Sequence, residues 1–226
     1  RFVACGADAS EYLFPGREGV LILANSIDVD EFATARERGT GDFAESYGLG
    51  SNCVKLVQIG RLQPVKNHQF TLDLARELTK SGVDFALFIV GVGPLHDAIY
   101  TRVQELGIAD RVFMLGGRSD IPQIMAKVDL VLMPSLHEGF PVVLVESQSS
   151  GVRALVSDSI SREVDLGVGL VDFLPLSASL DTWIQALTLP KSTHRLTTAE
   201  RIEILKKRGF DSLANVVTLE RLYANF

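Results

Sequence analysis

Residues 130–146 read Leu-Val-Leu-Met-Pro-Ser-Leu-His-Glu-Gly-Phe-Pro-Val-Val-Leu-Val-Glu: an apolar strand, a polar loop and a helix start. Leu130–Met133 is fully apolar, which is typical of a strand in a parallel sheet that helices cover on both faces. Pro141 suits a helix start, where its missing N–H costs nothing, and Gly151 suits the residue after the end. We therefore expect a helix at 142–150. The loop 135–140 leaves the carboxyl end of a strand, where open α/β sheets bind ligands.

Two carboxylates, Glu138 and Glu146, flank this helix start. At about 100° per residue the second lies about 80° beyond two full turns, so both can address one side of the helix start. The free backbone N–H groups there favour an anion such as a diphosphate, while carboxylates accept hydrogen bonds from hydroxyls. A diphosphate flanked by hydroxyls describes a nucleotide-sugar. The alternative, a buried helix with two solvated glutamates, is less consistent with the position of the loop.

The rest of the chain repeats the alternation of strands and helices. Strands are expected at 20–24, 54–59, 85–90, 112–115, 130–133 and 154–157, and helices at 68–81, 95–106, 121–128, 142–150, 179–187, 198–208 and 211–223. This pattern predicts an α/β fold, a Rossmann-like parallel sheet with helices on both faces and right-handed crossovers, plus carboxy-terminal helices. Residues 34–52 read as a connector with one helical turn around Phe43–Tyr47. The apolar stripe of the last helix, with Leu213 and Val216, is expected to cover a partner surface.

A second candidate element, Gly60-Arg-Leu-Gln-Pro-Val-Lys66, follows the strand 54–59. Gly60 permits close backbone approach, Arg61 offers a fork that matches phosphate oxygens, and Lys66 offers a point charge. We interpret this turn as a diphosphate clamp rather than a surface turn with two solvated cations, because it lies at the same sheet edge as Glu138. A Walker loop would need a second glycine directly before Lys66, so the pattern disfavours a P-loop NTPase.

A third candidate element, Gly91-Val-Gly-Pro94, again follows a strand and precedes a helix. His96 occupies the third glycine position of the dinucleotide fingerprint, so NAD binding is disfavoured. We expect a tight turn with Gly91 near the phosphates.

Other reactive residue types lack a supporting pattern. Asp28 and Asp30 match a D-x-D metal triplet, but a capping or turn role is favoured. The histidines show no zinc spacing, and we expect no bound metal and no cofactor besides the donor. His137 either lines the pocket or is simply exposed or packed. Cys5 and Cys53 suggest no disulfide framework and read as reduced cytosolic thiols.

Composition narrows the classes of protein further. The 226 residues suit one large domain, or one domain and a fragment of another. Lys and Arg number 22 against 28 Asp and Glu, a net charge of −6 without a dense basic run, so nucleic acid is not an expected partner. No apolar run approaches the roughly 18 residues that a membrane span needs. We expect a cytoplasmic protein, at most peripheral at the inner face of the membrane.

Taken together, these elements resemble the retaining glycosyltransferases of family 4, which have the two-domain GT-B architecture. The matching pieces are Asn25-Ser-Ile-Asp-Val-Asp-Glu-Phe32, Gly60-Arg61 with Lys66-Asn67, Gly91-Val-Gly-Pro94, Val112–Gly116, and Pro134-Ser135 leading into Glu138-x7-Glu146. The resemblance covers nearly the whole chain and is closest to enzymes of exopolysaccharide or capsule assembly. One departure is Arg153, where proline is common, and it should alter the turn rather than the chemistry.

The resemblance implies a retaining hexosyltransferase that moves a sugar from a nucleotide-sugar, with a UDP-sugar favoured, to a glycan or lipid-linked glycan. Arg61 and Lys66 would hold the diphosphate beside Gly60 and Gly91, and Glu138 would hold the donor sugar and face its anomeric centre. Glu146 would bind the ribose hydroxyls. The remaining implied site residues are Gly139, Phe140, the N–H groups near Val143 and Leu144, and Arg118 near the base.

The resemblance also implies a division of the chain. Residues 1–24 would end the amino-terminal acceptor domain, 25–52 would connect, 53–210 would form the nucleotide-sugar-binding domain, and 211–226 would pack toward the missing domain. The chain starts inside an apolar run without a methionine, and we expect it to be inactive alone. Two alternatives stay open: a nucleotide-sugar 2-epimerase of similar architecture, and a non-catalytic nucleotide-sugar-binding module.

Overall fold

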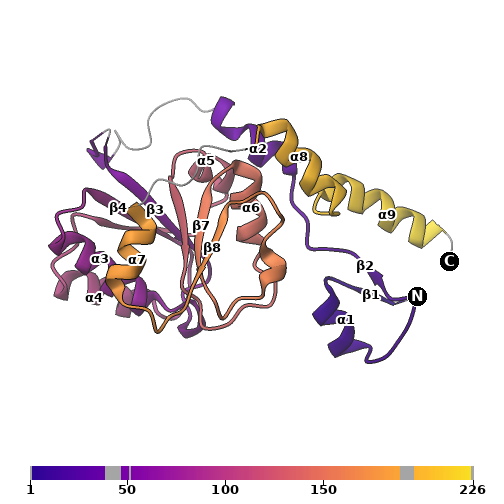
Figure 1. Cartoon of the computed structure of the whole chain (residues 1–226), viewed down its shortest axis with the longest axis horizontal. Helices are drawn as coiled ribbons and strands as arrows, with labels where there is room; N and C mark the ends of the chain where they lie inside the picture. Colours follow the sequence, from indigo (N-terminus) through magenta and orange to yellow (C-terminus); the bar gives the residue numbers. More distant parts are fainter. Residues whose placement is uncertain (1, 39–46, 51, 189–195, 225–226) are drawn as a thin grey trace.

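The computed structural model describes residues 2–38, 47–50, 52–188 and 196–224. One parallel sheet has the strand order β5-β4-β3-β6-β7-β8 (Figure 1). Its strands are β3 (Val54–Ile59), β4 (Phe85–Val90), β5 (Val112–Gly116), β6 (Leu130–Met133), β7 (Arg153–Ser157) and β8 (Val171–Leu174). In chain order this is the 3-2-1-4-5-6 arrangement of a doubly wound Rossmann-like fold. The predicted fold class is therefore confirmed.

The predicted elements match closely where the local apolar signal is strong. Strands β3, β4 and β6 have the predicted bounds, whereas β5 and β7 are each one residue longer. The edge strand β8 was missed, because its four residues include Asp172 and only Val171 is buried. Arg153, which was expected to alter a turn, begins β7. Its Nε donates to Asp172 Oδ2 at 2.7 Å and thereby links β7 to β8.

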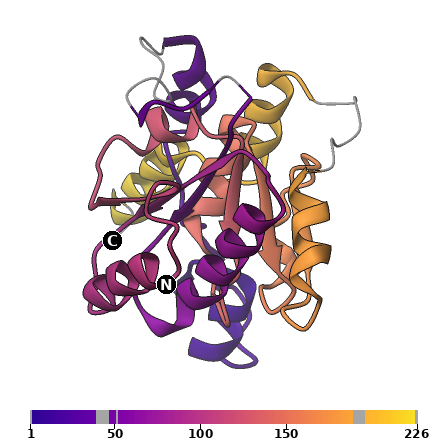
Figure 2. The same ribbon diagram turned by 90° about the vertical axis from the view of Figure 1, so that its left-hand side faces the viewer.

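Helices cover both faces of the sheet (Figures 1 and 2). One face carries α2 (Val29–Arg38), α5 (Ile121–Met125), α6 (Val142–Ser150) and α8 (Thr198–Lys207), with a core that includes Phe32, Met125 and Leu144. The other face carries α3 (His68–Lys80), α4 (His96–Glu105) and α7 (Leu180–Thr188), with Leu74 and the fully buried Trp183. The sheet is thus buried on both sides, as its apolar strands predicted.

Helix α2 corrects one prediction. Residues 34–38 were assigned to a connector, but they continue α2, which packs against α5, α6 and α8. The charged residues of this segment occupy the exposed side, while Phe32, Ala33 and Ala35 are buried. An amphipathic helix explains the pattern better than a connector does. Most of the helical turn predicted around Phe43–Tyr47 lies outside the described residues.

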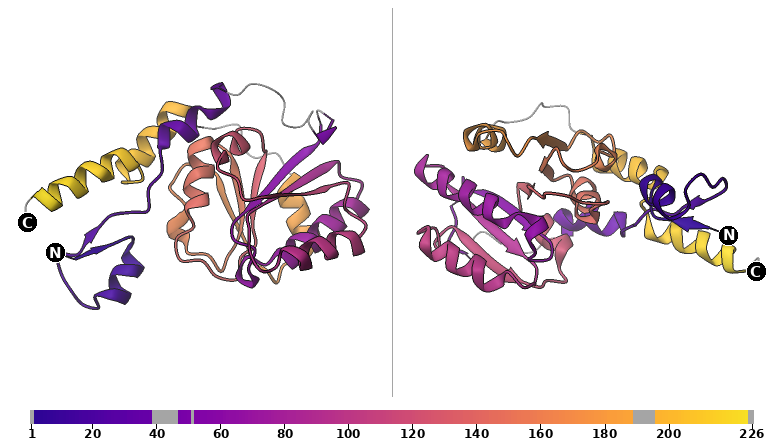
Figure 3. Two further views of the ribbon diagram at one scale, coloured as in Figure 1. Left: turned by 180° about the vertical axis from the view of Figure 1, so that it is seen from behind. Right: turned by 90° about the horizontal axis from the view of Figure 1, so that it is seen from below.

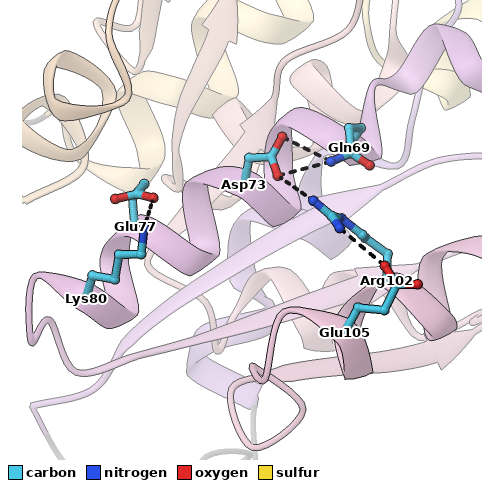
Figure 4. A network of polar contacts seen from close by, with 6 residues as sticks. All are labelled: Gln69, Asp73, Glu77, Lys80, Arg102 and Glu105. Carbon is cyan, nitrogen blue, oxygen red and sulfur yellow. Dashed lines mark hydrogen bonds and ion pairs between the residues drawn. The ribbon is translucent and has the colours of Figure 1, made fainter.

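The outer surfaces of α3 and α4 carry a polar network (Figure 4). Arg102 lies between Asp73, at 3.6 Å, and Glu105, at 3.2 Å. Gln69 donates to Asp73, and Lys80 pairs with Glu77 at 2.6 Å. Such exposed pairs contribute about 0–1 kcal/mol each, so burial of the apolar faces provides most of the stability here.

The first described residues and the last helix project from the same side of the sheet domain (Figures 1 and 3). Val3–Ala4 (β1) pairs in parallel with Leu21–Ile22 (β2) next to α1 (Ala7–Leu13). Helix α9 (Ser212–Ala224) has no buried residue and exposes Leu213, Val216 and Tyr223. Among the described residues, no helix is long and apolar enough to cross a membrane.

Candidate functional site

The two main candidate motifs meet where the strand order of the sheet reverses. Strands β3 and β6 are neighbours at the centre of the sheet, and the chain winds away from them in opposite directions. The carboxyl ends at such a switch point form a crevice that binds ligands in open α/β sheets. The clamp turn, residues 60–67, follows β3, and the glutamate loop, residues 134–141, follows β6. Two motifs that are distant in sequence thus share one crevice.

Hydrogen bonds tie these two loops together. Asn67 Nδ2 donates to the Pro134 carbonyl at 3.0 Å, and the Leu136 N–H donates to the Val65 carbonyl at 2.8 Å. Asn67 has a left-handed backbone, with φ 54°, and ends the 3₁₀ turn Pro64–Lys66. Gln58, from the buried end of β3, donates from Nε2 to the Lys66 carbonyl at 2.7 Å. The backbone of Lys66 is therefore held from two strands.

Lys66 and Glu138 form an ion pair across this crevice. Lys66 Nζ lies 2.6 Å from Glu138 Oε1, and the two side chains are 17% and 12% exposed. A Cβ on Gly60 would lie 3.0 Å from Lys66 Cε, so the missing side chain of Gly60 leaves room for the lysine. Three sequence-predicted site residues are thus brought together. The sequence had assigned the lysine and the glutamate to different parts of the ligand.

Gly91 occupies a position that accepts no side chain. Its φ is 148°, and a Cβ there would overlap the Gly60 carbonyl oxygen. The Gly91 N–H donates to the Gly116 carbonyl at 2.8 Å, which connects this turn to β5 as well. The predicted tight turn is confirmed, and it lies directly against the clamp turn.

The start of α6 supplies fewer free donors than predicted. Helix α6 begins at Val142 with Pro141 as its N-cap and ends at Gly151, which has φ 72°. The Leu144 N–H already donates to the Pro141 carbonyl at 3.0 Å, so its predicted role toward the diphosphate is weakened. Within the described part of the chain, the Val143 N–H has no acceptor. Val143 is thus the better candidate donor.

Glu146 is partly buried on the second turn of α6. Burial raises the pKa of its carboxyl from 4.5 to about 7. The described residues offer it no hydrogen bond or ion pair. A partly buried carboxylate without a donor is less stable than one in water, and a hydroxyl-bearing ligand would relieve that cost.

The two arginines of the prediction have different surroundings. The Arg61 side chain is exposed, and the described residues give its guanidinium no hydrogen bond or ion pair. Arg118 forms a two-pronged pair with Asp120, at 2.8 and 2.7 Å, in the loop after β5. Arg61 is therefore available to an anion beside Gly60. Arg118 would have to share or leave Asp120 to contact a ligand base.

A cavity of about 580 Å³ opens beside Glu138. The glutamate loop contributes His137, Glu138, Gly139 and Phe140 to its wall, and the loop after β7 contributes Ser159, Ser161 and Glu163. The opposite wall comes from the first described residues, with Cys5, Gly6, Ala9 and Tyr12. The hydroxyls of Ser159 and Ser161 and the carboxylates of Glu138 and Glu163 are groups that bind polar ligands. His137 is exposed and also lines this cavity, so both alternatives for it stay open.

Several buried polar atoms, on elements next to the clamp turn in the chain or in the sheet, have no hydrogen-bond partner among the described residues, and sequence reasoning missed them. They are Gln58 Oε1, both ring nitrogens of His68, Thr71 Oγ1 and Ser135 Oγ. Burial, with Lys66 nearby, lowers the pKa of His68 from 6.5 to about 4. Two residues that hold the backbone around Lys66 could have been found from the sequence. Gln58 is a polar residue in a mostly apolar strand, and Asn67 lies in a turn before a helix.

The D-x-D triplet has structural partners. Asp28 Oδ1 accepts a hydrogen bond from the Glu31 N–H at 2.8 Å, and this confirms the predicted capping role at α2. Asp30 pairs with Lys206 of α8 at 2.6 Å. These carboxylates therefore stabilise the packing of α2.

Comparison with known proteins is consistent with this geometry. The family model described as "Glycosyl transferases group 1" matches residues 42–165. The Bacillus subtilis (strain 168) protein EpsF, which carries the name of a glycosyltransferase, is 36% identical over 224 residues. The match covers 97% of this chain and 58% of EpsF. An Escherichia coli UDP-Gal:alpha-D-GlcNAc-diphosphoundecaprenol alpha-1,3-galactosyltransferase is 29% identical, over 90% of this chain and 54% of that protein.

Solved structures share the fold at low sequence identity. Anabaena Alr3699/HepE in complex with UDP and glucose aligns with a TM-score of 0.74 and 20% identity, over 99% of this chain and 62% of that one. WaaG, a glycosyltransferase involved in lipopolysaccharide biosynthesis, aligns with a TM-score of 0.72 and 20% identity, over 93% of this chain and 60% of that one. The chain therefore spans rather more than half the length of these relatives.

Proposed function

Since this chain belongs to the group 1 glycosyl transferases, which share the GT-B fold, we propose that it forms the donor-binding half of a retaining hexosyltransferase. The observation that carries the proposal is the meeting of Lys66, Gly60 and Glu138 at the switch point of the sheet. This crevice joins a cation for a diphosphate to a carboxylate for sugar hydroxyls.

The proposed donor is a nucleotide-sugar, with its diphosphate at the clamp turn. Arg61 and Lys66 provide the positive charge, and the Val143 N–H points from the positive end of α6. When the bond from the anomeric carbon to the diphosphate oxygen breaks, its electrons remain on the diphosphate. The clamp stabilises that growing negative charge, and Glu138 stabilises positive charge at the anomeric centre. Two cations and a helix start make a divalent metal unnecessary in this proposal.

Glu146 is proposed to bind the ribose hydroxyls, since the described residues offer its carboxylate no donor. Gly91 lies against the clamp turn and lets the backbone approach the phosphates. Arg118 is proposed to lie near the base after partial release from Asp120.

UDP is the proposed nucleotide, and a glycan or lipid-linked glycan of extracellular or capsular polysaccharide synthesis is the proposed acceptor. The names of the relatives support this choice: one uses UDP-Gal and a diphosphoundecaprenol-linked acceptor, and a structural neighbour holds UDP and glucose. A lipid-linked acceptor would place the reaction at the cytoplasmic face of the membrane.

The acceptor is proposed to bind mainly to a second domain, of which residues 1–24 form the end, before the chain enters α2, which packs on the donor-binding domain. The exposed apolar side chains of α9 are proposed to pack against that domain, because a water-facing stripe of this kind is costly in an isolated chain. Residues 53–210 of the chain would then bind the donor, and the chain alone would not transfer sugar.

Calorimetric titration with UDP-, GDP- and ADP-sugars in EDTA tests the proposal. We expect a UDP-sugar to bind without divalent metal. Failure of every nucleotide-sugar to bind, or binding only when magnesium or manganese is added, would contradict it.

A further inference from the structure

Lys66, one of the two cations of the clamp turn, is already neutralised by a carboxylate of the chain itself. Lys66 Nζ lies 2.6 Å from Glu138 Oε1, and both side chains are largely buried. Arg61 has no such partner among the described residues. Any diphosphate that binds Lys66 must therefore draw the lysine away from Glu138 or share it.

The pair is fixed by its surroundings. Gln58 and Asn67 hold the backbone around Lys66, and Asn67 bonds directly to Pro134 at the start of the glutamate loop. Gly60 leaves the space in which the lysine side chain lies. The lysine and the carboxylate are consequently held within contact distance by the chain itself. Because the chain already orders both side chains, the ion pair forms without a further cost in conformational entropy.

From this geometry, and resting on the proposed function, we propose that Glu138 makes the site discriminate a nucleotide-sugar from the bare nucleoside diphosphate. A bare diphosphate draws the Lys66 ammonium group toward itself. Glu138 is then left with a weaker ion pair, and the negative charge of the diphosphate lies nearby. Like charges at close range oppose each other, most strongly away from bulk water. A nucleotide-sugar carries the same diphosphate, but its sugar also supplies hydroxyl donors. The cavity of about 580 Å³ beside Glu138 provides room for them.

The same balance favours release of the product. Once the sugar has left, the nucleoside diphosphate no longer provides donors for Glu138, and the carboxylate competes again for Lys66. The Lys66–Glu138 ion pair therefore exists before the donor binds and forms again when the nucleoside diphosphate leaves. In a chain without this carboxylate, the bare nucleotide should bind more tightly and the preference for the sugar-bearing form should fall.

The test compares the affinities of wild type and Glu138→Gln for UDP and for the UDP-sugar that binds best, by calorimetry on the full chain. We expect Glu138→Gln to bind UDP roughly tenfold more tightly and to lose most of its preference for the UDP-sugar. Glu105→Gln, on the outer surface of α4, removes the same charge far from the crevice and should change neither affinity. Glu138→Ala is a second variant in case the glutamine protein does not fold, and it should also tighten UDP binding.

The outcomes separate this inference from the function on which it rests. If wild type binds UDP, and the folded Glu138 variants bind it equally or more weakly, the discrimination role is wrong while the donor site stands. If wild type binds none of UDP, GDP and ADP or their sugars, the proposed function fails, and the inference fails with it.

Discussion

Replacing Glu146 by glutamine should stabilise the chain above pH 7. Burial raises the pKa of this carboxyl from 4.5 to about 7, so the folded chain favours the protonated form. The contribution to stability is therefore complete below pH 4.5 and is lost as the pH rises through 7. At 1.36 kcal/mol per pKa unit the whole difference is about 3.4 kcal/mol. Since the side chain is partly exposed, we expect about 1–3 kcal/mol.

Urea denaturation at pH 5 and pH 8 measures this effect. Glutamine resembles the protonated carboxyl at every pH, so Glu146→Gln should exceed wild type in unfolding free energy at pH 8 and nearly equal it at pH 5. Glu203→Gln, whose side chain is 71% exposed, is the matched control and should leave both values unchanged. Equal stability of Glu146→Gln and wild type at pH 8 would refute the reasoning.

The same carboxyl predicts how nucleotide binding depends on pH. If ribose hydroxyls donate to ionised Glu146, UDP binding lowers the pKa of the carboxyl and releases a proton near pH 7. Affinity should therefore rise from pH 6 to pH 8, and the heat of binding should depend on the ionisation enthalpy of the buffer. In Glu146→Gln both dependences should weaken. Their persistence in the variant would assign the proton to another group.

Three further changes test the clamp turn and its support. Gly91→Ala should destabilise the chain by more than about 2 kcal/mol in urea denaturation, because the new Cβ would overlap the Gly60 carbonyl; a stable variant would show that the turn adapts. Asn67→Gly keeps the left-handed backbone and removes the bond to Pro134, so UDP affinity should fall roughly tenfold while the fold survives; unchanged affinity would argue against a positioning role. Arg61→Ala should weaken UDP binding by about 1.5–3 kcal/mol without loss of stability, and equal affinity would exclude this arginine from the clamp.

The sequence alone predicted the sheet and most of its helices. Strands β4 and β6 are short apolar runs, β3 is mostly apolar apart from Lys55 and Gln58, and a glycine or proline follows each of the three; α6 ends at a glycine in the left-handed conformation. These signals are local, because a chain segment buried on both faces must be apolar along its whole length. The tight turn at Gly91 was predictable for the same reason, because a turn between a strand and a helix is determined by a few adjacent residues. Weak local signals failed, as with β8 and α2.

The contact between Lys66 and Glu138 could not be read from the sequence. The two residues are separated by 72 positions, and each has a sensible ligand role alone. Only the pairing of β3 with β6 sets their loops side by side, and the Asn67 bond to Pro134 then fixes the distance. Likewise, the raised pKa of Glu146 depends on how deeply packing buries α6. Residue types and spacing determine which groups are available, whereas strand order and burial determine which groups meet and how strongly they interact.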